Sequence, residues 1–229
     1  MARRIRSCAI DVDGTLLTSD GRVTDRTARV LQRARAEGVL PIICTGKIPG
    51  PWQEAIRAMK LDAPMIFLQG ALVLDAAGEA LLERRIAPEA CAAALALTDA
   101  LEAEHGRDVA CCLACCGGTY RATGPSPMAR EVPAGFLAHG EPEPQAVGAP
   151  LASAVDVAAV NKLVVLFSDA MPGLAGMGDR VRTAVGEGAD VVACERPCPR
   201  YPATPSILTT RPPRRRRAMQ TATTRTWSR

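Results

Sequence analysis

Hydrophobic residues in the first seventy positions alternate between short continuous runs and longer stretches with helical spacing. The continuous runs predict strands at 5–10, 39–44 and 65–68. The spaced stretches predict helices at 24–38 and 51–61. Strands that are apolar on both faces and separated by amphipathic helices are typical of a parallel sheet covered by helices. We therefore expect an α/β fold with a parallel sheet in this part of the chain.

The pattern changes from about residue 71, where two short apolar runs flank Ala-Ala-Gly-Glu and predict a hairpin over 71–86. An alanine-rich helix is predicted at 88–105. The remaining predicted elements are strands at 109–113, 162–167 and 190–194, a helix at 179–187 and a Pro- and Gly-rich connection at 124–150. These elements indicate an α+β domain inserted after the third strand.

We accordingly divide the chain into an α/β core at 1–70, an inserted α+β domain at 71–198 and a tail at 199–229. The tail is rich in Pro, Arg and Thr, and we expect it to be disordered.

Composition and charge narrow the class of protein. Apolar residues make up 48% and charged residues 23% of the 229 residues, as in ordinary globular proteins. No apolar run reaches the roughly 18–20 residues of a membrane span, and no secretory signal is recognisable, so we expect a cytoplasmic protein without a membrane partner. Seven arginines in the last nineteen residues produce the net charge of +4. A nucleic-acid partner would depend on that tail alone, and we do not expect one.

The nine cysteines are an odd number, which argues against a disulfide framework. Cys112 and Cys115 have the spacing of a zinc half-site, but no second pair of cysteines or histidines completes it. We interpret this segment as a strand in which cysteine serves as a small hydrophobic residue, with zinc binding as the alternative.

Candidate chemistry lies at the ends of the first two predicted strands. Asp11 and Asp13 follow the first strand, and Thr45 and Gly46 follow the second. Ligands of parallel sheets bind at the carboxyl ends of the strands. Two carboxylates there can provide a nucleophile and a proton-transfer group. Thr45 offers a hydroxyl and a main-chain N–H to a phosphoryl oxygen, and Gly46 allows close approach.

The segments "IDVDGTLL" and "GVLPIICTGK" resemble the first two motifs of the haloacid dehalogenase superfamily. The resemblance is to its Cof-like phosphatases, which have a Rossmann-like core and a large α/β cap of the C2B-like type after the third strand. It implies Mg2+-dependent hydrolysis of small phosphorylated metabolites through an aspartyl-phosphate. Asp11 would be the nucleophile and Asp13 the general acid and base, and the two residues would also hold Mg2+. Thr45 and Gly46 would bind the phosphate.

The sequence departs from the family at several positions. Lys47 stands where arginine is usual, and Gln69 stands where asparagine is usual. The family's later lysine and its Gly-Asp-x-x-Asn-Asp metal loop are absent from the sequence. Lys162 lies in a predicted strand of the inserted domain, so we do not expect it to replace that lysine. The core strands expected after the cap are also absent, so the first strand is predicted to be an open edge.

Two functional alternatives follow from these departures. The first is a phosphatase that binds Mg2+ weakly and turns over slowly or not at all, since its cation lacks the usual additional carboxylates. The second is a non-catalytic protein that binds a partner through the inserted domain. A third, RNA binding, depends on the arginine-rich tail.

The tail suggests a change of reading frame near residue 200. Suppose that the codons for residues 217–228 are read in the frame that begins at the third base of each codon. The genetic code then permits a peptide that resembles the missing metal loop. The same frame over 200–206 permits a Pro-Gly-x-Ser-Lys string that resembles the lysine motif. The alternative is that the match arises by chance, because the amino-acid sequence leaves most of these bases undetermined. The coding nucleotides distinguish a change of frame from chance.

Overall fold

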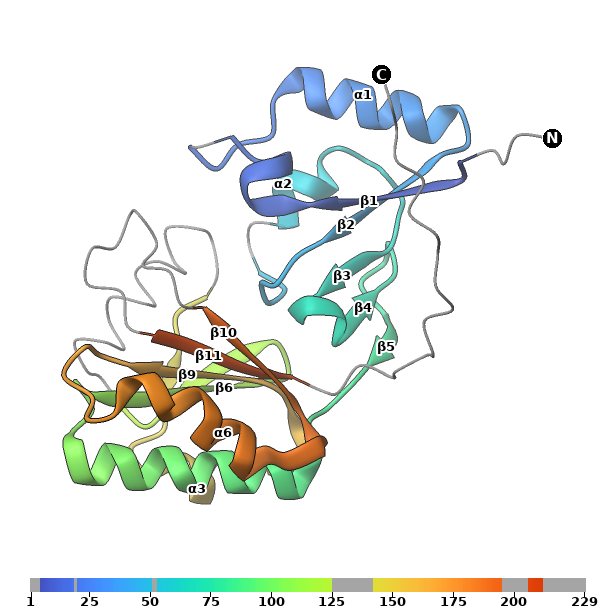
Figure 1. The fold of residues 1–229 in the computed structure, drawn as a ribbon. Helices are drawn as coiled ribbons and strands as arrows, with labels where there is room; N and C mark the ends of the chain where they lie inside the picture. The colour runs from blue at the N-terminus through green and yellow to red at the C-terminus, as the bar shows by residue number, and fades with distance from the viewer. Residues whose placement is uncertain (1–4, 19, 51–52, 125–141, 195–205, 212–229) are drawn as a thin grey trace, which may run out of the picture.

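The computed structural model describes residues 5–18, 20–50, 53–124, 142–194 and 206–211. These residues form two sheets with helices packed on them (Figure 1). No helix in these ranges is long and apolar enough to cross a membrane.

The first sheet has the strand order β1-β2-β3-β4-β5. The first three strands are parallel, and the last two extend the sheet as an antiparallel hairpin. Its strands are β1 (Ser7–Asp11), β2 (Leu40–Cys44), β3 (Met65–Phe67), β4 (Leu72–Leu74) and β5 (Ala80–Glu83). Helices α1 (Asp25–Ala36) and α2 (Gln53–Arg57) connect the parallel strands (Figure 1). The α/β fold predicted for this part of the chain is thus confirmed.

Helix α1 begins where its sequence predicts. The side chain of Thr24 accepts a hydrogen bond from the main-chain N–H of Thr27 and caps the helix. Asp25 in the first turn and Arg33 and Arg35 in the last turn have the charges that the helix dipole favours.

The second sheet has the strand order β10-β11-β9-β6-β7-β8 and is antiparallel except between β7 and β8. Its strands are β6 (Ala110–Cys116), β7 (Thr119–Ala122), β8 (Gln145–Ala146), β9 (Val160–Phe167), β10 (Asp190–Cys194) and β11 (Ser206–Arg211). Helices α3 (Pro88–His105) and α6 (Met177–Val185) lie together on one face of this sheet (Figure 1). The short helix α5 (Leu151–Ala154) precedes β9.

Strand β9 is buried along its whole length because both of its faces are covered. Leu163 and Phe167 belong to a core formed with helices α3 and α6. Val164 and Leu166 belong to a second cluster that also contains Ile43 and other residues of the first sheet, which we call the shared core. Double coverage explains why residues 163–167 of β9 are a continuous apolar run in the sequence.

Three expectations from the sequence are corrected by the sheet pairing. The predicted hairpin forms, but β4 and β5 join the first sheet, so the boundary placed at residue 71 does not separate the two sheets. Strands β7 and β8 and helix α5 were not predicted. Residues 206–211, assigned to a disordered tail, form β11 between β9 and β10. The segment Ser-Ile-Leu-Thr-Thr-Arg has high strand propensity, and two neighbouring strands provide its hydrogen-bonding partners. The rest of the predicted tail lies outside the described residues.

Strand β1 lies at the edge of the first sheet in the described part of the chain, as predicted. It pairs with β2 in parallel, and four of its five residues are exposed. Helix α1 beside it has no buried residue, and Val30 on that helix is exposed. This edge of the first sheet is therefore poorly covered in the described part of the chain.

Candidate active site

The chain turns sharply after β1, immediately beyond Asp11. Residues Val12–Leu16 form a single wide turn, closed by a hydrogen bond of 3.0 Å from the N–H of Leu17 to the carbonyl oxygen of Val12. Val12 and Leu16 are buried and anchor the turn from below, while Asp11 and Asp13 remain exposed. Gly14 has a φ of +73°, a conformation that other residues adopt only at a cost. The turn thus keeps both carboxylates at the surface of the strand end.

The loop after β2, residues 45–47, is held by main-chain hydrogen bonds to the segment that follows β3. The N–H of Thr45 donates to the carbonyl oxygen of Ile66 at 2.8 Å, and its carbonyl accepts from Gln69 at 3.3 Å. The carbonyl of Lys47 accepts from Leu68 at 3.2 Å. The Thr45 hydroxyl oxygen accepts from the N–H of Lys47 at 3.1 Å. These contacts give the loop a fixed shape.

The Gln69 side chain approaches Gly46 closely. A Cβ atom at position 46 would lie 2.5 Å from Nε2 of Gln69, well inside contact distance. Gln69 itself has a φ of +52°, so the chain after β3 takes an unusual path to reach this position. A larger residue at position 46 would therefore require the Gln69 amide to move.

The two strand ends bring the predicted residues together. Asp11 is the Cα partner of Cys44 in the parallel ladder, which places it beside the start of loop 45–47. The Nζ atom of Lys47 lies 2.9 Å from Oδ1 of Asp13 and joins the two loops by an ion pair. Asp11, Asp13, Thr45 and Gly46 thus lie at adjacent carboxyl ends of β1 and β2, where the sequence placed them.

Two lysines complete the surroundings of loop 45–47. Lys47 was noted in the sequence only as a departure from a motif, and the structure shows it as the partner of Asp13. The Nζ atom of Lys162, on β9, donates to the carbonyl oxygen of Gly46 at 3.2 Å. Lys162 belongs to the second sheet, yet its side chain reaches the loop of the first. A charged residue next to a five-residue apolar run in the same strand was the signal that could have found it.

The donor set for a metal ion is small. In the described ranges no group of three or more His, Cys, Asp or Glu residues is placed to hold a metal ion. Mg2+ in phosphate-processing sites is often held by one or two carboxylates, with water and substrate phosphate as further ligands. The Asp11 carboxylate and the Asp13 carbonyl could provide this small number of protein ligands.

The cysteines of β6 behave as core residues. Cys111, Cys112 and Cys115 are buried and free of disulfides. Burial raises the pKa of the Cys112 thiol well above its usual value and raises the pKa of Cys91 to about 12. The interpretation of this segment as a strand is confirmed, and the half-site spacing of Cys112 and Cys115 reflects two positions of that strand.

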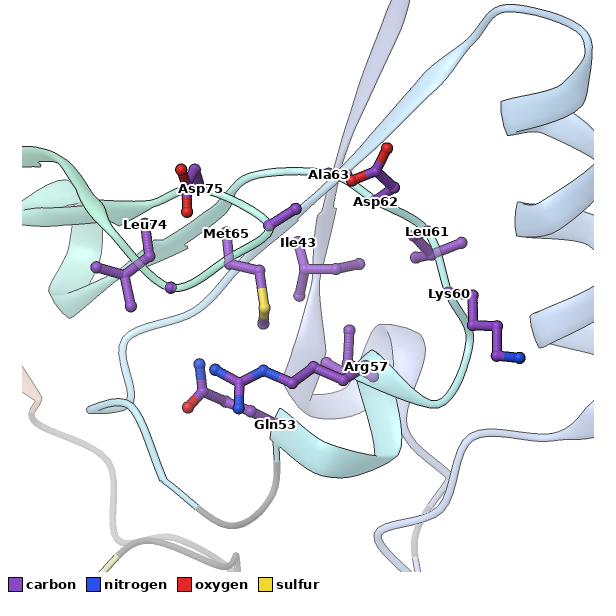
Figure 2. Close-up of a pocket in the computed structure, with 13 residues that line it drawn as sticks. Ile43, Gln53, Arg57, Lys60, Leu61, Asp62, Ala63, Met65, Leu74 and Asp75 are labelled. Carbon is purple, nitrogen blue, oxygen red and sulfur yellow. The ribbon is translucent and has the colours of Figure 1, made fainter.

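A pocket of about 310 Å³ lies away from these residues, between α2 and strands β3 and β4 (Figure 2). Arg57 and Lys60 on its wall are balanced by Asp62 and Asp75. Its wall includes Ala63 and Met65 at the start of β3, whereas loop 45–47 follows the end of the neighbouring parallel strand. The pocket therefore does not form part of the candidate active site.

The chain is similar to proteins of one known family. Residues 8–121 match the model of the haloacid dehalogenase-like hydrolase family. An HMP-PP phosphatase of Klebsiella pneumoniae is 34% identical over 87 residues, which cover 38% of this chain and 32% of that protein. A 5-amino-6-(5-phospho-D-ribitylamino)uracil phosphatase of Bacillus subtilis is 31% identical over 71 residues, or 31% of this chain and 28% of that protein. The matched segments therefore span less than a third of these curated relatives.

Solved structures show the same fold over most of the chain. A protein from Thermotoga maritima superposes with a TM-score of 0.68 at 15% identity, covering 92% of this chain and 70% of its own. A sugar phosphatase of subclass IIB of the haloacid dehalogenase superfamily superposes with a TM-score of 0.64 at 17% identity, covering 90% and 70%. By the family match over residues 8–121, this chain belongs to the haloacid dehalogenase-like hydrolase family.

Proposed function

We propose that this chain is the major part of a Mg2+-dependent phosphatase that hydrolyses small phosphate monoesters through an aspartyl-phosphate on Asp11. The observation that carries the proposal is the placement of Asp11 beside loop 45–47, with Asp13 tied to that loop by the Lys47 ion pair. Nucleophile, proton-transfer group and phosphate-binding loop then share one edge of the sheet, as phosphoryl transfer requires.

The reaction proceeds in two displacements. A carboxylate oxygen of Asp11 attacks phosphorus, an O–P bond forms, and the ester P–O bond breaks. Asp13 gives a proton to the departing alkoxide, which leaves as an alcohol. Asp13 then takes a proton from a water molecule as that water attacks phosphorus, and phosphate leaves with Asp11 regenerated.

The loop after β2 binds the phosphoryl group during both steps. The donors are the Thr45 hydroxyl and the main-chain N–H of Gly46. The N–H groups of Thr45 and Lys47 already donate within the protein, and those hydrogen bonds fix the shape of the loop. The Asp11 carboxylate and the Asp13 carbonyl would hold Mg2+, which when bound would supply positive charge against the repulsion between carboxylate and phosphate.

The second sheet serves as a cap in this proposal. Its β6 and β9 strands share a hydrophobic core with the first sheet, and Lys162 reaches loop 45–47. A cap in this position excludes water and selects the leaving group of a small phosphorylated metabolite. The cytoplasmic location stays a prediction, and the residues on which nucleic-acid binding would depend lie mostly outside the described ranges.

A second candidate is a non-catalytic protein of the same fold that binds a phosphorylated ligand. The observation in its favour is the small metal donor set, since the described residues offer no third carboxylate near Asp11 and Asp13. Binding would then persist without turnover.

Hydrolysis of p-nitrophenyl phosphate by the purified chain, with and without Mg2+, tests the proposal. Asp11→Asn removes the nucleophile and should abolish activity, while Asp179→Asn, at an exposed position on α6, serves as the matched control. Activity that requires Mg2+ and disappears only in the Asp11 variant supports catalysis. Folded protein that binds orthophosphate but does not hydrolyse the ester supports the second candidate.

A further inference from the structure

The pocket between α2 and strands β3 and β4 has no role in the proposed reaction, yet it has the dimensions of a binding site. Its volume of about 310 Å³ lies at the lower end of the range for small-molecule sites, about 300–1,000 Å³. Ile43, Met65 and Leu74 line it with apolar side chains (Figure 2). The pocket can therefore take the apolar body of a small ligand, and its polar groups decide which kind.

Residues 60–63, which form one wall of the pocket, are held from behind by α1. Nε of Arg35 donates to the carbonyl oxygen of Leu61 at 3.0 Å, and Nη2 of Arg35 donates to the carbonyl oxygen of Asp62 at 3.2 Å. None of the described residues that line the pocket belongs to α1, so this wall stands between α1 and the cavity. The two carbonyl groups therefore point away from the pocket.

The main-chain N–H groups of Asp62 and Ala63 consequently face the pocket. The N–H and C=O groups of a trans peptide point in opposite directions, and these peptide bonds are trans. Neither N–H group donates to an acceptor in the described part of the chain. Ala63 is buried, and buried main-chain donors almost always have an acceptor. Water or a ligand in the pocket must supply it.

The backbone of this wall turns both N–H groups to the same side. Lys60 has a φ of +52° and Asp62 a φ of +46°, although neither residue is glycine. Such conformations cost free energy and are concentrated at ligand-binding and catalytic positions. Successive N–H groups that a left-handed residue turns to one side form a concavity that binds anions.

The carboxylates around the pocket do not compete for that anion site. Cations and anions are equal in number on the wall, but the carboxylates have partners of their own. The Asp62 carboxylate lies 3.4 Å from Nη2 of Arg35. Oδ1 of Asp75 accepts a hydrogen bond of 2.8 Å from the N–H of Glu79. Figure 2 shows both carboxylates away from the guanidinium group of Arg57.

Arg57 is the cation that reaches into the pocket. Its side chain extends from α2, and Nη2 lies 3.7 Å from the position that a Cβ atom on Gly78 would take, on the opposite wall (Figure 2). It makes no hydrogen bond or ion pair with any described residue. Lys60, in contrast, points away from the centre of the pocket (Figure 2). A guanidinium group with unused donors can bind a carboxylate through two parallel hydrogen bonds.

We propose that this pocket binds a small monocarboxylate with an apolar body, at a site separate from the candidate active site. Arg57 supplies the positive charge, and the N–H groups of Asp62 and Ala63 supply fixed donors. Ile43 and Met65 contact the body of the ligand. A single negative charge fits because Arg57 is the one cation directed into the pocket among the described residues that line it.

Titration of the isotope-labelled chain with isocaproate, followed by amide NMR spectra, tests the proposal. The amide resonances of Asp62 and Ala63 should move to low field and saturate, with a dissociation constant in the millimolar range or below, as expected for so small a ligand. Isocaproamide has the same shape without the charge and should bind at least about 10-fold more weakly.

Two arginine variants separate the pocket from general charge effects. Arg57→Met removes the guanidinium group, keeps most of the apolar stem and should weaken isocaproate binding about 10- to 100-fold. Arg29→Met removes the same charge from an exposed position on α1 and should bind like the parent. Both positions are exposed, so both variants should unfold at the urea midpoint of the parent.

Three results would overturn the proposal. They are the absence of saturable shifts in the folded parent, equal binding of isocaproate by Arg57→Met and the parent, and equal binding of isocaproate and isocaproamide. Shifts confined to Gly46 and its neighbours would also overturn it, because the carboxylate would then occupy the candidate active site. None of these readouts involves ester hydrolysis, so the proposed function can fail while this site stands, and the reverse.

Discussion

The ion pair between Asp13 and Lys47 has one buried and one exposed partner, and its two truncations should therefore differ in cost. The Lys47 side chain is 8% exposed and the Asp13 side chain 52%, with 2.9 Å between Nζ and Oδ1. Asp13→Ala removes the carboxylate that the buried ammonium group contacts. Lys47→Met removes the ammonium group and leaves a carboxylate that water already reaches.

The magnitudes follow from that asymmetry. Breaking a fully buried pair typically costs 3–5 kcal/mol, and with one end in solvent we expect about 2–3 kcal/mol for Asp13→Ala. Methionine keeps most of the apolar stem of Lys47, and an exposed carboxylate loses little. We therefore expect Lys47→Met to change the free energy of unfolding by about 1 kcal/mol or less.

Urea unfolding of the two single variants and the double variant, followed by circular dichroism, measures both terms and their coupling. The double variant should be close to Lys47→Met, because removing the ammonium group relieves the cost of losing its carboxylate. If Lys47→Met costs as much as Asp13→Ala, the burial of the ammonium group does not control the energetics of this pair and the reasoning is refuted.

Three further predictions concern the site and the cores. Thr45→Val leaves the buried main-chain N–H of Lys47 without its acceptor and should lower the free energy of unfolding by about 1–3 kcal/mol. Thr45→Ser keeps the hydroxyl and should lower it by less. Equal urea midpoints for the two variants would contradict the role of the hydroxyl. Gly188→Ala would place a Cβ atom 2.6 Å from Cβ of Ala90 and should cost about 1–3 kcal/mol, whereas Gly176→Ala, which meets open space, should be neutral in the same assay. Burial raises the folded-state pKa of the Cys91 thiol from 9.0 to about 12. Between these values only the unfolded chain releases the thiol proton. The free energy of unfolding therefore falls as the pH rises from about 9 to 12. Cys91→Ala should reduce that fall in unfolding midpoints measured across this pH range, and an identical pH dependence in both proteins would argue against the shift.

The sequence by itself determined the local structure and the chemistry of the strand ends. Continuous apolar runs and helical spacing located β1, β2, β3 and most of the later elements, and α3 begins and ends where it was predicted. Asp11 and Thr45 could be placed together because parallel strands end at the same edge, a rule that needs no coordinates. These features depend on neighbours in the chain or on a general rule of sheet geometry.

Tertiary structure decided which sheet each strand joins and where Lys162 lies. An apolar strand such as β4 pairs equally well with either sheet as far as its own residues are concerned, and its place beside β3 depends on a tight turn through residues with positive φ. The segment 206–211 becomes β11 only because β9 and β10 leave a gap that offers main-chain partners to a strand.

Lys162 shows the limit most clearly. Its position in an apolar strand was visible in the sequence, but its distance from Gly46 depends on which face of β9 meets the first sheet. Period-two alternation assigns residues to two faces without saying what covers each one. Only the packing of one sheet on the other makes that choice, because burial of the shared core determines which face turns inward.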